Sequence, residues 1–283
     1  MELYRVESLT FTYPGQSAPA LRDVSLTLCA GEFVTLCGLS GSGKSTLLRQ
    51  LKTALAPNGV RSGAVLFAGR PLSDVSQREQ AERIGFVQQS PENQIVTDKV
   101  WHELAFGPES LGYDTPTIRR RVAEMAGFFG MESWFHRETA SLSGGQKQLL
   151  NLAAVLTLQP DVLILDEPTA QLDPIAAADF LAALARVNRE LGTTVLLSEQ
   201  RLEEALPLSD RAVVLDGGAV LADGAPRAVG AQLRTAGHEL FRAMPAAMRV
   251  WAAVENDLPC PVSVREGRDW LADFAASHPL KSL

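Results

Sequence analysis

The run Gly38-Leu39-Ser40-Gly41-Ser42-Gly43-Lys44-Ser45 decides the fold of this chain. It follows the β-rich segment EFVTLCG at residues 32–38 and precedes KSTLLRQLKTAL at residues 44–55, whose apolar residues recur at helical spacing. A glycine-rich loop that joins a strand to a helix in this way is the phosphate-binding loop pattern. We expect the helix to continue until Pro57-Asn58-Gly59 ends it.

The chemistry of such a loop assigns a role to each kind of residue in it. The glycines let backbone N–H groups converge on phosphate oxygens, and the helix N-terminus adds positive potential. Lys44 would neutralise phosphate oxygens, and the Ser45 hydroxyl would be a ligand of Mg²⁺. The alternative is a flexible Gly-Ser turn, which eight residues in register with the right flanks disfavour. The predicted phosphate-contacting residues are Gly38, Ser40, Gly41, Gly43, Lys44, Ser45 and Thr46.

Two adjacent carboxylates end a second apolar segment, Val162-Leu163-Ile164-Leu165-Asp166-Glu167-Pro168. Open α/β sheets bind ligands at the carboxyl ends of their strands. Asp166 would hold Mg²⁺ through its water shell, and Glu167 would polarise an attacking water as general base. Alone, the pair could be an acidic turn after a core strand. Together with the phosphate loop it indicates a nucleotide-hydrolysing site with Lys44 and Glu167 as catalytic residues.

The order of the segments predicts an α/β fold. Short β-rich segments in the first third indicate an antiparallel sheet, and alternating helices (115–129, 145–158, 175–191) and strands (162–165, 194–197) indicate a mostly parallel core sheet. A Gly217-Gly218 turn predicts a hairpin. We predict an ATPase domain over residues 1–225 and a C-terminal extension over 226–283, with short helices near 227–234 and 244–254.

Composition limits the classes of function. A formal net charge of −7 argues against a nucleic-acid-binding protein with a broad basic face. Three scattered cysteines, Cys29, Cys37 and Cys260, predict a reducing compartment, with Cys29 and Cys37 packed as small apolar residues. The amino terminus lacks signal-peptide features, and the apolar run from Leu149 is too short to cross a bilayer. Any association with a membrane would therefore need a partner.

The segment Leu142-Ser143-Gly144-Gly145-Gln146 precedes a predicted helix. By itself it would be a helix cap. With the other two motifs it resembles the signature LSGGQ of the ABC ATPase family, and the resemblance covers roughly residues 3 to 225. It implies an ABC ATPase core with an antiparallel β subdomain and a helical signature subdomain. It also implies that Ser143, Gly144, Gly145 and Gln146 contact ATP held by a second ATPase subunit, in a homodimer or a heterodimer.

Three further positions match the family in order. Tyr13, in FTYPG, matches the aromatic residue that stacks on adenine, although an aromatic in an edge strand is otherwise a packing residue. Gln89 matches the glutamine that contacts Mg²⁺ and links the site to the transmembrane partner, with Gln88 as the alternative. Asp173 matches the loop that signals across the dimer, or else caps the helix that begins at Pro174.

One position departs from the family pattern. After the strand TTVLL the family places a histidine that contacts the γ-phosphate, and this chain has Gln200. Glutamine can donate a hydrogen bond but carries no positive charge. Losing one well-aimed transition-state donor costs about 3 to 4 kcal/mol, so we predict slow or absent turnover at this chain's own site. None of the histidines (His102, His136, His238, His278) is placed to substitute.

Two segments, SPENQIVTDKVWHELAFGPESLG from Ser90 and SEQRLEEAL from Ser198, resemble the ATPase subunits of energy-coupling-factor (ECF) transporters. That resemblance implies import of vitamins or transition-metal ions, a transmembrane partner whose coupling helices dock near Gln94, and a peripheral position on the cytoplasmic face of a prokaryotic cell membrane. The alternatives are the ATPase subunit of another class of ABC transporter and a soluble ABC ATPase without a transport role. The latter predicts a coiled coil, a duplicated domain or basic surfaces.

Overall fold

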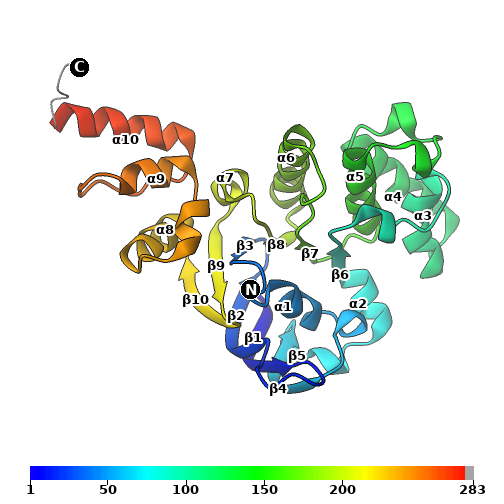
Figure 1. Ribbon diagram of the computed structural model, residues 1–283. Coiled ribbons are helices and arrows are strands. Elements are labelled where there is room, and N and C mark those ends of the chain that lie inside the picture. The colour runs from blue at the N-terminus through cyan, green and yellow to red at the C-terminus, as the bar shows by residue number, and fades with distance from the viewer. Residues whose placement is uncertain (278–283) are drawn as a thin grey trace.

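The computed structural model describes residues 1–277 and is built around a six-stranded sheet (Figure 1). Four neighbouring strand pairs are parallel, and only the edge hairpin of the last two strands is antiparallel. From one edge to the other the strands are β10 (Ala219–Gly224), β9 (Arg211–Asp216), β3 (Phe33–Cys37), β8 (Thr194–Ser198), β7 (Val162–Asp166) and β6 (Ile84–Val87). The predicted parallel core and the Gly217-Gly218 hairpin are confirmed.

A second, four-stranded antiparallel sheet contains β2 (Leu21–Cys29), β1 (Glu2–Thr12), β4 (Val60–Phe67) and β5 (Arg70–Pro71), in that order. Its buried face, which includes Leu9 and Phe67, forms one hydrophobic cluster with Ile164 and Leu196 of the parallel sheet. Alternation along a strand places Leu163 and Leu165 on the opposite face, in a second cluster. The antiparallel subdomain predicted for the first third is therefore confirmed.

Helices cover both faces of the parallel sheet. Helices α3, α4 and α5 form a separate lobe, seen at the right of Figure 1, which packs together with α6 in the second cluster. The predicted helices in these regions are confirmed to within two residues. The helices before the C-terminal part are α1 (Lys44–Gln50), α2 (Gln77–Arg83), α3 (Val100–Ser110), α4 (Thr115–Phe128), α5 (Gly144–Leu156), α6 (Pro174–Leu191) and α7 (Leu202–Ala205).

The helix after the phosphate loop is shorter than predicted. It ends at Gln50, and Thr53–Leu55 forms a separate 3₁₀ turn. Contacts with distant elements take the place of helical backbone hydrogen bonds here: the Leu51 carbonyl accepts from the Tyr4 hydroxyl at 2.6 Å, and the Thr53 N–H donates to Oε1 of Gln80 at 3.0 Å. The apolar spacing predicted a helix through these residues because a periodicity in sequence does not detect long-range hydrogen-bond partners.

The C-terminal part contains α8 (Pro226–Thr235), α9 (Ala246–Ala252) and α10 (Val264–Ser277). Its apolar residues, among them Leu233, Met248 and Trp270, form a third cluster with Val214 of β9. The division of the chain at residue 225 stays a prediction. Residues 278–283, including His278, lie outside the described residues. Of the helices within residues 1–277, none combines the length and the apolar character that crossing a bilayer requires.

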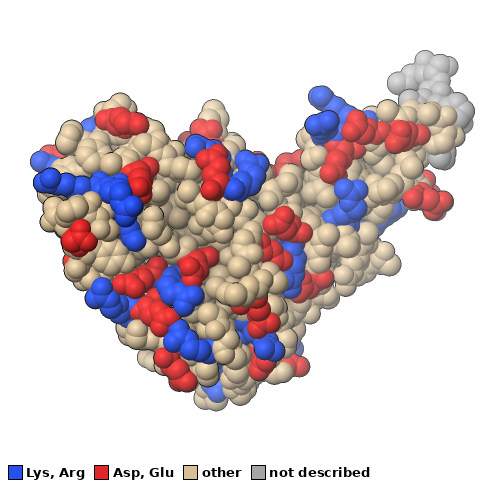
Figure 2. Space-filling model, turned by 180° about the vertical axis from the view of Figure 1, so that it is seen from behind, with Lys and Arg blue, Asp and Glu red and all other residues tan. Residues whose placement is uncertain are grey.

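The surface carries charges of both signs. On the face that Figure 2 shows, lysine and arginine side chains are interspersed with aspartate and glutamate over all parts of the molecule. One detail of the cysteine prediction was wrong: Cys37 is buried, but Cys29 is exposed. Cys29 is the last residue of β2, and its side chain lies on the outward side of that strand.

Candidate nucleotide site

A cavity of about 520 Å³ lies at the carboxyl ends of β3, β7 and β8, beside the phosphate loop. Residues far apart in sequence meet there, since the parallel strands β7 and β8 bring Asp166 opposite Ser198. The predicted site residues that line this cavity are Tyr13, Ser40, Gly41, Gly43, Lys44, Ser45, Thr46, Gln89, Glu167 and Gln200. The structure therefore assembles most of the predicted set in one place.

Lys44 lies folded against its own loop. Its Nζ donates to the carbonyl oxygens of Gly38 at 2.8 Å and Leu39 at 3.2 Å, and lies 3.6 Å from Oε1 of Glu167. The side chain is 5% exposed. A buried ammonium needs such partners, because an isolated buried charge is strongly unfavourable. The loop thus holds a desolvated positive charge at the wall of the cavity.

Two glycines of the loop have backbone conformations and surroundings that exclude a side chain. Gly38 has a φ of 151°, and a Cβ there would lie 2.4 Å from the Leu215 carbonyl oxygen. Gly43 has a φ of 103°, and a Cβ there would lie 2.7 Å from the Ala20 carbonyl oxygen. Glycine is therefore required at both positions for the loop to turn and still pack against the strands beneath it.

Ser45 and Asp166 form a hydroxyl–carboxylate pair, in which Oγ donates to Oδ1 at 2.8 Å. Burial is the largest cause of the raised pKa of Asp166, and the hydrogen bond from Ser45 opposes it. Within residues 1–277 no group of three or more His, Cys, Asp or Glu side chains could hold a metal ion. A single carboxylate with a neighbouring hydroxyl fits Mg²⁺, which takes few protein ligands and completes its shell with water and phosphate oxygens.

Glu167 has an unusual backbone. Its φ is 47°, in the left-handed region that residues other than glycine seldom adopt, and its N–H donates to the Ser198 carbonyl at 3.0 Å. Its side chain accepts a 2.8 Å hydrogen bond at Oε2 from Nε2 of Gln200. Strained positions of this kind persist where the surroundings determine them. Here β8 and the residues after it hold the carboxylate against the cavity.

The structure also reveals Glu199, which the sequence reasoning did not single out. Its side chain is buried, and Oε2 accepts from the Thr169 hydroxyl at 2.6 Å. The other oxygen, Oε1, accepts from the backbone N–H of Gln200 at 2.7 Å and of Arg201 at 3.0 Å. Arg201 in turn donates to the Leu172 carbonyl at 2.7 Å. These bonds join the segment after β7 to the segment after β8.

A charged residue two positions after the apolar run Val195-Leu196-Leu197 was the available signal for Glu199. Such a residue is buried only when it is paired. Its side-chain partner Thr169, however, lies 30 residues earlier in the chain. Sequence spacing does not identify partners at that separation.

Tyr13 lies at the cavity wall, where its hydroxyl is 3.0 Å from the Thr46 hydroxyl and its ring packs edge-on against Phe11. Gln89 lines both this cavity and an adjoining one of about 460 Å³ that reaches Asp166. Gln88 lines only the adjoining one. The side chain of Gln94 is engaged within the chain: its Oε1 accepts from the Gln88 N–H at 2.9 Å and its Nε2 donates to the Phe86 carbonyl at 3.0 Å.

The segment Ser143 to Gln146 does not line this cavity. It begins α5 as a capping box: Ser143 Oγ accepts from the Gln146 N–H at 3.3 Å, and Gln146 Oε1 accepts from the Ser143 N–H at 3.0 Å. Asp173 caps α6 by accepting from the N–H groups of Ile175 and Ala176, each at 3.0 Å. The cap alternatives for both motifs are therefore present in the structure.

The fold and this cavity define a phosphate-loop α/β nucleotide-binding protein. A family model described as ABC transporter matches residues 21–170. A solved structure of cbiO1 from Clostridium perfringens, described as part of the ABC transporter complex cbiONQ, is similar with a TM-score of 0.74 and 31% identity over 83% of this chain and 94% of that one. The chain therefore belongs to the ABC transporter family, among its ATP-binding proteins.

Two other relatives agree with this assignment. The ATP-binding cassette MJ0796, solved as a dimer in a post-hydrolysis state with ADP and Pi, matches with a TM-score of 0.69 and 25% identity over 79% of this chain and 98% of that one. A Bacillus anthracis protein described as an ABC transporter ATP-binding protein is 44% identical over 96% of this chain. The chain spans about half, 49%, of the length of that relative.

Proposed function

We propose that this chain binds and hydrolyses ATP to power an ECF-type ABC importer of vitamins or transition-metal ions. The observation that supports hydrolysis most directly is the meeting of Lys44, the Ser45–Asp166 pair and Glu167 at two adjoining cavities at the carboxyl ends of the parallel strands. The similarity to cbiO1 of the cbiONQ complex supports the ECF assignment. The transported substrate itself would be bound by another subunit.

In the proposed reaction, water attacks the γ-phosphorus of ATP in line, and the bond from that phosphorus to the bridging oxygen breaks to give ADP and inorganic phosphate. The loop N–H groups and Lys44 bind the phosphate oxygens, so Lys44 exchanges the Gly38 and Leu39 carbonyls for them. Ser45, Gln89 and Asp166 would hold Mg²⁺, which when bound offsets negative charge on the phosphates. Glu167 accepts the proton of the attacking water at a carboxylate oxygen, and Gln200 keeps that carboxylate oriented.

The separation of Ser143–Gln146 from this cavity supports a dimer in which each signature segment contacts ATP in the other subunit. The dimeric state of MJ0796 agrees with this arrangement. The partner is a second copy of this chain or a different ATPase. A transmembrane subunit would dock beside the 3₁₀ turn Pro91–Asn93 and place the complex on the cytoplasmic face of a prokaryotic membrane.

The test is steady-state ATPase activity of the full chain beside Glu167→Gln and Gln200→His, with Glu190→Gln as an exposed-carboxylate control. Glu167→Gln should lower kcat at least about 100-fold and leave ATP affinity within about threefold, because removing a general base affects the chemical step. The control should match the unaltered chain. Unchanged turnover in Glu167→Gln would show that hydrolysis at this cavity is not the function.

A further inference from the structure

The turn Gly217-Gly218, between β9 and β10, joins the phosphate loop to the antiparallel sheet. The Gly218 N–H donates to the Ser42 carbonyl of the loop at 3.1 Å, and the Gly218 carbonyl accepts from the Arg22 N–H of β2 at 2.7 Å. Figure 1 shows β10 beside β2. The turn is therefore bonded on one side to the phosphate loop and on the other to a strand of a different sheet.

The side chain of Arg22 adds a second bond to this turn. Its Nε donates to the Gly217 carbonyl at 2.7 Å, so the backbone and the side chain of one residue each hold one carbonyl of the turn. Arg22 is exposed and lines neither the nucleotide cavity nor the adjoining one. An effect of this side chain on ATP would therefore have to pass through the turn.

The turn approaches its neighbours so closely that position 218 requires glycine. Gly218 has a φ of 84°, and a Cβ there would lie 2.7 Å from the Ala20 carbonyl oxygen. A Cβ on Gly43 of the phosphate loop would lie 3.6 Å from the Gly218 Cα. Because the atom nearest to a Cβ on Gly218 belongs to the backbone, a side chain at this position would displace the turn.

The two strands that carry the turn are packed against the C-terminal part of the chain. Val229 and Leu233 of α8 belong to the same hydrophobic cluster as Val214 of β9 and Ala222 of β10. Side chains in such a cluster are close-packed and yield little. This packing limits movement of the hairpin, so the turn can serve as a fixed support for the loop.

The bond from Gly218 orients one peptide unit of the phosphate loop. The Ser42 carbonyl shares a planar trans peptide with the Gly43 N–H, and the two groups of such a unit point in opposite directions. Within residues 1–277 the Gly43 N–H has no hydrogen-bond acceptor, and Gly43 lines the nucleotide cavity. Successive backbone N–H groups of this kind bind anions. Fixing the Ser42 carbonyl therefore fixes the direction of an N–H that is free to meet phosphate.

We propose that Gly218 and Arg22 are positioning residues for ATP. By holding the Ser42 carbonyl, the turn keeps the Gly43 N–H directed at the bound phosphates. Neither Gly218 nor Arg22 lines the nucleotide cavity, so both act through the loop. The inference rests on the proposed function, because it concerns the same ATP. It assigns to the β9–β10 hairpin a part in nucleotide affinity in addition to its place in the sheet.

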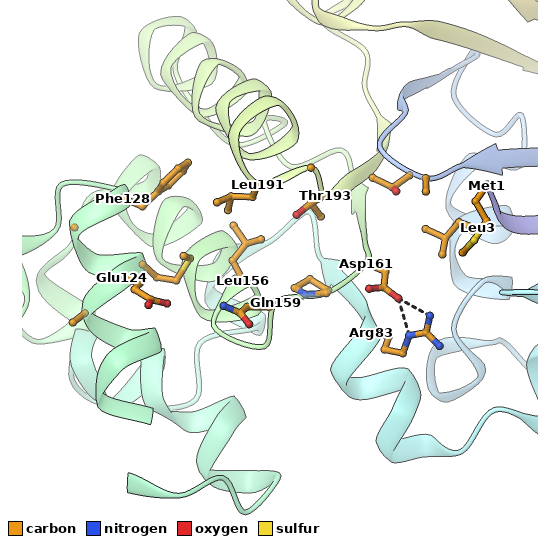
Figure 3. A pocket seen from close by; sticks show the side chains of 17 residues that line it. Met1, Leu3, Arg83, Glu124, Phe128, Leu156, Gln159, Asp161, Leu191 and Thr193 are labelled. Carbon is orange, nitrogen blue, oxygen red and sulfur yellow. Dashed lines mark hydrogen bonds and ion pairs between the residues drawn. The ribbon is translucent and has the colours of Figure 1, made fainter. Parts of the chain in front are cut away.

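The test is ATP affinity, measured by calorimetry with Mg²⁺ on the full chain in the Glu167→Gln background, which serves as parent. Gly218→Ala should weaken ATP binding at least about tenfold, because the displaced turn no longer orients a phosphate-binding N–H. The matched control is Gly192→Ala. Gly192 has a φ of 71°, but a Cβ there meets nothing within 4 Å. It lies at a separate cavity of about 960 Å³, at the amino ends of β6, β7 and β8 (Figure 3).

Both glycine substitutions strain a left-handed backbone, but only Gly218→Ala displaces the turn, so Gly192→Ala should keep ATP affinity within about twofold of the parent. Arg22→Ala removes the donor to Gly217 without adding an atom and should weaken ATP binding about threefold or more. Its control is Arg61→Ala, at an exposed arginine of β4, which should leave the affinity unchanged. Titrations in about 0.5 M KCl screen the long-range effect of the lost charge.

Urea unfolding without nucleotide establishes which variants are folded, and if Gly218→Ala is not, Arg22→Ala decides alone. A turn that only stabilised the fold would lower the unfolding free energy and leave the ATP affinity of the folded variants at the parent's value. That result would overturn the inference while the proposed function stands. Equal losses of affinity in the variants and their controls would overturn it as well. Absence of ATP binding in the parent would refute the proposed function and, with it, the role of the turn.

Discussion

The side-chain amide of Gln200 donates to Oε2 of Glu167 at 2.8 Å, while Nζ of Lys44 lies 3.6 Å from Oε1 of the same carboxylate. Both oxygens of the proposed general base therefore have partners, from the segment after β8 and from the phosphate loop. Lys44 would turn toward phosphate when ATP binds, which frees Oε1 for water, whereas Gln200 can stay in place. This relationship makes Gln200 an orienting residue as well as a candidate phosphate contact.

Substitutions at Gln200 should separate these contributions. Gln200→Ala removes the donor to Glu167 and should lower kcat by about 10- to 100-fold, with little change in KM for ATP. Gln200→His restores a group that can carry positive charge and should raise kcat above that of the unaltered chain. Steady-state ATPase assays measure both variants. Equal kcat in Gln200→Ala and the unaltered chain would show that this hydrogen bond has no part in turnover.

Ser143 can be tested for a role beyond its helix cap. Ser143→Ala should destabilise the chain by about 1 kcal/mol through loss of the cap, whereas Ser143→Asp keeps an equally good cap. In the proposed dimer, however, an aspartate would face the phosphates of the partner's ATP and prevent ATP-dependent dimerisation. Urea unfolding and size-exclusion chromatography in the Glu167→Gln background give the two readouts. Dimerisation of Ser143→Asp at the level of the parent would contradict the proposed contact.

Glu199 should be important for stability as well as for turnover. Glu199→Ala would leave the buried Thr169 hydroxyl and two partly buried backbone N–H groups without their acceptor, at a cost of about 3 kcal/mol. Glu199→Gln retains one acceptor oxygen and should cost less. Because the same bonds position Gln200, both variants should also lower kcat. Urea unfolding measures the stabilities of Glu199→Ala and Glu199→Gln, with Glu190→Ala as a control at an exposed position. Equal stability of Glu199→Ala and the control would be inconsistent with this network.

Lys52 should give the chain a measurable pH dependence of stability. Burial lowers its pKa from 10.5 to about 8. Between these values the unfolded chain binds a proton that the folded chain does not, so the contribution of Lys52 to stability rises as the pH increases from 8 to 10.5. Lys52→Met lacks this effect. As the pH rises through this interval, the unfolding free energy of the unaltered chain should therefore increase relative to that of Lys52→Met. Parallel curves of unfolding free energy against pH for the two proteins would rule the effect out.

The local motifs were predictable because their chemistry resides in adjacent residues. The segment from Gly38 to Ser45 contains its own turn, its own N–H groups and, in Lys44, its own cation. The apolar residues before Asp166 form a strand, so its carboxylate lies at the carboxyl end of that strand. The order of strands and helices could be predicted for the same reason, because periodicity is a local property, and the structure confirms that order. The end of α1 was predicted wrongly, because Tyr4 and Gln80 supply hydrogen-bond partners from other elements to the backbone of Leu51 and Thr53.

What the sequence alone determined is thus the fold class and the identity of the phosphate loop and carboxylate motifs, which short-range spacing encodes. Only the tertiary structure decided that Gln200 contacts Glu167 and that Glu199 links two loops. It also decided that the Gln94 side chain bonds within its own chain and that a cavity opens at the amino ends of the parallel strands. These features depend on strand register and on packing between distant elements. Hydrogen bonds and cavities form between surfaces, and sequence spacing does not specify which surfaces meet.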